Sequence, residues 1–135
     1  MMKVRINERE DKLEVALVFS DSRLVDLEFA LLTVAQERRW ELKRTDISRD
    51  HVHYQVSDGG TFLASIHFTH GLEPPTRVLI ENRPTEADAY GPAHKKSTAA
   101  FAEAFLQECA ARVLASDKAV AAAIQELERH AKAIA

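Results

Sequence analysis

Residues 58–60, Asp-Gly-Gly, separate two stretches of alternating apolar and polar residues, and this segment constrains the fold most. Apolar side chains recur at every second position on both sides, the period of a β-strand with one buried face. The pattern predicts a β-hairpin over residues 51–69. Because the register must bring both apolar sets to one face, we expect a three-residue loop, with glycine in the left-handed conformation, that pairs Val56 with Phe62.

The same register collects three histidines on the polar face of the hairpin. His51 is expected directly opposite His67, and His53 opposite Ser65 and diagonal to His67. Directly opposed Cβ atoms lie about 4.5–5.5 Å apart and diagonal ones about 7–8 Å apart, so the imidazoles converge. Three imidazoles can ligate zinc or another divalent ion and leave one position open for water. The alternatives are ordinary polar residues on a solvated face, or a patch that titrates near neutral pH.

The remaining periodicity predicts the other elements of the fold. Further strands are expected at 3–7, 12–19, 40–47 and 76–82, and a helix at 22–38. The alanine-rich region from residue 99 onward is expected to form one bent helix or two, with a cap at Ser116 or Asp117. The order is β-β-α-β-β-β-β-α-α, and short turns favour antiparallel pairing. We therefore expect a single α+β domain over residues 1–135, with a curved antiparallel sheet packed on helices in two layers.

The last predicted helix carries an apolar seam with spacings of four and three residues, which is a short heptad pattern. Its large members are Val120, Ile124, Leu127 and Ile134. A narrow apolar seam on an alanine-rich helix indicates a contact surface. We expect these residues to bind a protein partner or a second copy of the chain.

Composition excludes several classes of protein. The chain has 135 residues, 46% hydrophobic and 29% charged, the balance of a folded protein that can bury a core. Its net charge of -3 argues against broad, non-specific nucleic-acid binding, which needs a basic surface, but leaves a local basic patch open. The single cysteine, Cys109, excludes an internal disulfide, and its apolar surroundings in sequence predict a buried thiol. Without an apolar segment long enough for a bilayer or a signal region, we expect a cytoplasmic protein without membrane contact.

Sequence signatures of common enzymes are missing from the chain. It has no glycine-rich phosphate loop, nucleophile elbow, HExxH or CxxC. This favours a small protein-interaction module without enzymatic activity or cofactor, such as an inhibitor, an immunity-type protein, an adaptor or a chaperone. The alternative is a small-ligand or divalent-metal-binding protein, with zinc or a similar ion held by His51, His53 and His67.

Overall fold

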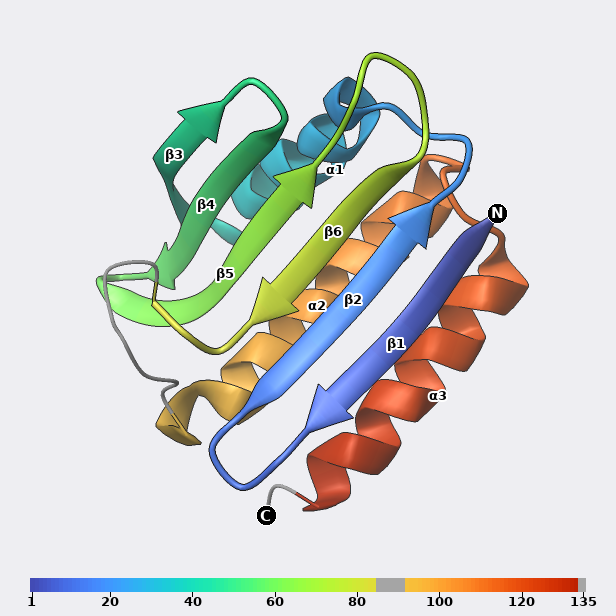
Figure 1. Cartoon of the computed structure of the whole chain (residues 1–135). Helices are drawn as coiled ribbons and strands as arrows, with labels where there is room; N and C mark the ends of the chain where they lie inside the picture. The colour runs from blue at the N-terminus through green and yellow to red at the C-terminus, as the bar shows by residue number, and fades with distance from the viewer. Residues whose placement is uncertain (85–91, 134–135) are drawn as a thin grey trace.

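The computed structural model describes residues 1–84 and 92–133. Six antiparallel strands form one sheet, and three α-helices pack against it on one side (Figure 1). The strands are β1 (Met2–Glu8), β2 (Leu13–Phe19), β3 (Glu41–Ser48), β4 (His51–Asp58), β5 (Thr61–Thr69) and β6 (Thr76–Glu81). The helices are α1 (Leu24–Arg38), α2 (Lys95–Ala111) and α3 (Asp117–Ala133), with a short 3-10 turn η1 (Pro92–His94) before α2. The predicted α+β class and element order are confirmed.

The strands lie in the order β1-β2-β6-β5-β4-β3. Strand β6 therefore joins the N-terminal hairpin to the three strands β3, β4 and β5, and it pairs with both β2 and β5. Consecutive strands in the sequence are neighbours except for β2 and β3, and β6, which lies between β2 and β5, joins the two groups of strands into one sheet. This placement sets β6 directly beside the strand that carries His67.

The strands bury every second side chain beneath the helices, and they turn the others to a face that no described helix covers (Figure 1). The largest fully buried side chains are Leu13, Leu17, Phe19, Ile66, Phe68 and Ile80 from the sheet, and Leu27, Leu31, Phe101, Phe105, Leu106 and Leu127 from the helices. Burial of each such side chain contributes about 1.5–3 kcal/mol to the free energy of unfolding. The core thus lies between the sheet and the helices and leaves the opposite face free to carry a site.

The turn between β4 and β5 is shorter than the sequence predicts. Gly59 and Gly60 have φ of 56° and 87° and form a two-residue turn that Asp58 and Thr61 close. Such a turn matches the twist of the strands, and glycine adopts it without steric cost. The expectation of a three-residue loop is therefore wrong.

A β-bulge next to this turn restores the predicted faces. The pairing shifts between Val56 and Ser57, so that Leu63 is an extra residue in β5 and Val56 faces Ala64 instead of Phe62. The register is thus displaced by two residues from the expectation. Because side chains alternate with a period of two, a displacement of two leaves the apolar sets on one face, as predicted.

The C-terminal region forms two helices instead of one bent helix. Val113, with φ of 60°, interrupts the helical backbone between α2 and α3. Ser116 caps the start of the second helix, because its Oγ accepts a hydrogen bond of 3.0 Å from the backbone N–H of Ala119. The predicted cap at this position is confirmed.

Cys109 on α2 is fully buried in the core, as predicted. Burial, followed by the negative charge of Glu108, raises the pKa of its thiol to about 12. The thiol is therefore protonated and inert at neutral pH. Among the described helices, none combines the length and hydropathy that a bilayer crossing requires.

Candidate metal centre

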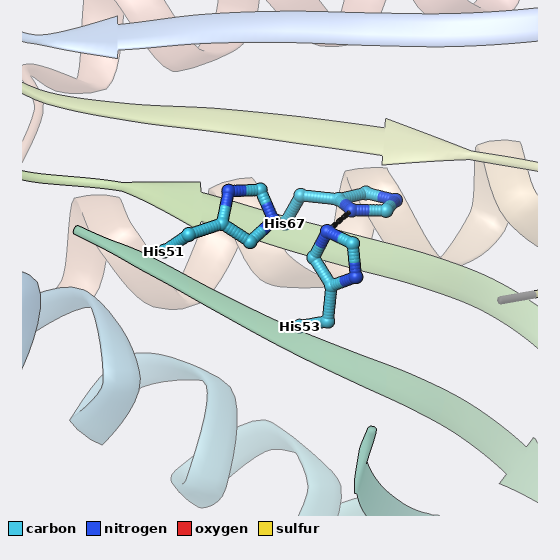
Figure 2. A group of neighbouring side chains, drawn as sticks. All are labelled: His51, His53 and His67. Atoms are coloured by element: carbon cyan, nitrogen blue, oxygen red, sulfur yellow. Dashed lines mark hydrogen bonds between the residues drawn. The ribbon is translucent and has the colours of Figure 1, made fainter. Parts of the chain in front are cut away.

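Three histidines converge on the sheet face opposite the helices. His51 and His53 extend from β4, two residues apart and hence on the same side of the strand, while His67 extends from β5 beside them (Figure 2). One ring nitrogen from each of the three lies within 4.8 Å of the others. The convergence predicted from the sequence is confirmed.

The contact between His53 and His67 is closer than the sequence predicts. The observed register sets His53 directly opposite His67 and sets His51 opposite Thr69. The ring centroids of His53 and His67 are 3.7 Å apart, and those of His51 and His53 are 4.0 Å apart. His53 Nε2 and His67 Nδ1 face one another (Figure 2). The displaced register therefore tightens the cluster, although the pairs of opposed residues expected from the sequence are wrong.

Glu81 on β6 holds the ring of His67 from the other side. Its Oε1 lies 2.9 Å from His67 Nε2, and the residue is only 2% exposed. Because a carboxylate accepts a hydrogen bond from an N–H, this contact assigns the proton of a neutral His67 to Nε2 and leaves the lone pair on Nδ1, which faces His53 Nε2. A metal-ligating histidine commonly donates its second N–H to a carboxylate in this way.

The ionisation states of His53 and Glu81 suit metal binding. Burial, and then the positive charges of His67 and His51, lower the pKa of His53 to about 4. Burial alone would raise the pKa of Glu81, but the hydrogen bond and charge of His67, together with the charge of Arg83, bring it below its usual value. At neutral pH His53 is therefore a neutral imidazole and Glu81 is an anion.

A second carboxylate approaches the cluster from β3. A bulge at Thr45 lets Asp46 pair with His53, while Arg44 still pairs with Tyr54. The bulge moves Asp46 to the face that carries the histidines, since without it Thr45 would occupy that position. The negative charge of Asp46 acts on His53 in the direction that raises its pKa.

Glu81 and Asp46 were not predicted from the sequence as members of this site. The alternation in residues 76–82 places Glu81 on the polar face of its strand, but only the pairing of β5 with β6 shows that it contacts His67. Asp46 depends on a bulge for which the sequence around Thr45 has no recognisable signal. Both contacts arise from strand pairing across the sheet.

The seam predicted on the last helix packs within the chain. Val120 and Leu127 are buried, and Ile124 is partly buried against the same core. Ile134 lies outside the described residues. The described seam residues fill the space between α3 and its neighbours α2 and β1.

No family model, curated protein or solved structure matches the chain.

Proposed function

We propose that the protein binds a divalent transition-metal ion, with zinc as the first candidate, through His51, His53 and His67. The observation that carries this proposal is the convergence of three imidazole nitrogens within 4.8 Å, with Glu81 at the far nitrogen of His67. A tetrahedral zinc ion with nitrogen ligands at about 2.0–2.1 Å separates those atoms by about 3.3 Å. His53 Nε2 and His67 Nδ1 lie closer together than this spacing, so binding an ion requires these two rings to separate.

The chemistry of the ligand set favours zinc and related ions over magnesium or calcium. Imidazole suits zinc, copper, nickel and iron, whereas magnesium and calcium prefer oxygen ligands. The converging group contains no carboxylate among the described residues. The only thiol, Cys109, lies in the core with its pKa raised to about 12 and is not a competing ligand.

Calorimetric titration of chelator-treated protein with zinc tests the proposal. We expect one ion per chain, and at least a tenfold loss of affinity in His53→Ala and in His67→Ala, since each removes one of three ligands. His70→Ala is the matched control, because His70 is not part of the converging group. A wild-type protein that binds no zinc, or variants that bind as wild type does, would overturn the proposal.

An exposed apolar stripe on α1 favours a second candidate function, association between two copies of the chain. Val25, Phe29 and Leu32 recur at helical spacing and are 55%, 57% and 48% exposed. The stripe borders a groove that extends to Trp40 and Leu42. A two-fold axis brings the same patch of both copies together, so a continuous apolar stripe suits a symmetric dimer.

Light scattering across a range of protein concentrations tests this second candidate. We expect a dimeric mass that Phe29→Asp reduces to that of a monomer. Leu72→Asp is the control, since Leu72 is 98% exposed and lies in the loop between β5 and β6. A monomer at every concentration would contradict self-association. If the protein is a monomer and binds a different protein through α1, the stripe is the contact surface for that protein and not for a second copy.

A further inference from the structure

Thr69 and Arg77 lie beside the histidine cluster on the same face of the sheet. His51 pairs with Thr69, and Thr69 pairs with Arg77, so the three residues form one row across β4, β5 and β6. Neighbouring strands are about 4.7–4.9 Å apart, which separates the backbones of His51 and Arg77 by about 10 Å. Thr69 thus lies between His51 and Arg77 on the face that carries the histidines.

The polar groups of this row are available to a ligand. Thr69 and Arg77 are both exposed, and their side chains form no hydrogen bond or ion pair with the described part of the chain. Lys3 follows in the same row beyond Val18 and adds a further exposed positive charge. An anion at this place would meet charge that no described partner neutralises.

The carboxylates near the cluster lie on other sides of it. Glu81 is turned toward His67 and Arg83, and Asp46 faces His53 from β3. Glu14, on β2, forms an ion pair of 2.6 Å with Lys12. Asp50 lies at the opposite end of the row, where its carboxylate accepts a hydrogen bond from Ser48, the residue paired with His51. The end of the row at Thr69 and Arg77 is therefore the positive one.

We infer that the bound ion keeps one exchangeable coordination position, directed toward Thr69 and Arg77, and that this position takes an oxyanion of the phosphate-monoester class. The inference rests on the proposed metal function. Three protein ligands leave the fourth position of a tetrahedral ion open, and the described residues supply only three. A dianionic phosphate suits a metal ion combined with an arginine, which binds phosphate oxygens through two N–H groups.

Phenyl phosphate added to the cobalt-loaded protein tests the inference through the visible absorption of the ion. We expect a saturable change in the absorption bands, because a new oxygen ligand alters the coordination of cobalt. Arg77→Gln is expected to weaken phenyl phosphate binding about tenfold, the loss typical of one charge-assisted contact. Arg129→Gln on α3 is the matched control, since it removes an arginine from the helical layer. Acetate is expected to bind more weakly because it carries one charge.

The outcomes separate this inference from the proposed metal function. Cobalt bound with an absorption spectrum that phenyl phosphate leaves unchanged would overturn the exchangeable position and leave the metal site intact. Equal affinity for acetate would overturn the phosphate class. Equal affinity in Arg77→Gln and wild type would overturn the part assigned to Arg77. Failure to bind cobalt or zinc would overturn both proposals.

Discussion

Glu81 Oε1 lies 2.9 Å from His67 Nε2, and the two residues are 2% and 8% exposed, so the contact is buried on the face of the sheet away from the helices. The two side chains come from neighbouring strands and lie diagonally across them. Because the carboxylate accepts a hydrogen bond from the Nε2–H, the lone pair of a neutral His67 lies on Nδ1, which faces His53. Glu81 thereby determines which nitrogen of His67 is available to a metal ion.

Substitution Glu81→Gln is expected to reduce zinc affinity about 10-fold to 100-fold, the usual effect of losing a carboxylate behind a metal-ligating histidine. The amide retains the shape of the side chain but not the charge that fixes the ring. Competition with a chromophoric chelator measures the affinity, and Glu128→Gln on the exposed surface of α3 serves as the control. An unchanged zinc affinity in Glu81→Gln would contradict the proposal that Glu81 orients the ring of His67.

Acidification is expected to destabilise the metal-free protein. The pKa of His53 falls from 6.5 to about 4 on folding, so between these pH values the unfolded chain binds a proton that the folded chain does not. The free energy of unfolding therefore decreases as pH falls through this window. The lowered pKa of Glu81 acts in the same direction below pH 4.5.

Urea denaturation at pH 7 and pH 5, with a chelator present, measures this dependence. The midpoint is expected to be lower at pH 5, and the difference is expected to shrink in His53→Gln, which has no titrating imidazole. Equal midpoints at both pH values would show that burial of His53 does not lower its pKa.

Replacement of Gly60 by alanine is expected to destabilise the β4–β5 hairpin. Gly60 has φ of 87°, a backbone conformation that costs a residue with a Cβ atom about 1–2 kcal/mol. Gly71→Ala is the control, because its φ lies outside that region and an added Cβ meets only ordinary contacts. Urea denaturation compares the free energies of unfolding, and equal losses in both variants would contradict the turn geometry described for Gly60.

The thiol of Cys109 is expected to react slowly with a disulfide reagent in the folded protein. It is fully buried and its pKa is raised to about 12, so little thiolate is present at neutral pH. Labelling should become fast in urea above the unfolding transition. Rapid labelling in buffer would show that α2 exposes this position by local opening.

The faces of the strands were predictable from sequence, whereas the pairing of particular residues was not. Alternation in β4 and β5 places His51, His53 and His67 on one face whatever the loop length, provided that the apolar sets meet. The partner of each histidine depends on the turn at Gly59 and on the bulge in β5. The turn and the bulge are local backbone conformations, and an alternating pattern with a period of two fits the sequence equally well with or without them.

The two carboxylates of the candidate site, Asp46 and Glu81, could not be predicted from the sequence for a related reason. Alternation from Trp40 and Leu42 would place Asp46 beneath the helices, and the bulge at Thr45 reverses this. Glu81 reaches His67 only because β6 inserts between β2 and β5, a pairing over a long sequence separation. The apolar seam of α3 has the predicted period. The period alone does not distinguish a seam that packs against another chain from one that packs in the core of its own chain, as this one does.

X-ray absorption at the zinc edge of the loaded protein tests the three-histidine centre, because it reports the atoms bound to the ion. We expect three imidazole nitrogens at about 2.0–2.1 Å and a further light atom in the remaining position. His53→Ala is expected to reduce the number of imidazoles in the spectrum. Fewer than three imidazoles in the wild-type protein, or a sulfur atom at about 2.3 Å, would contradict a centre built from His51, His53 and His67.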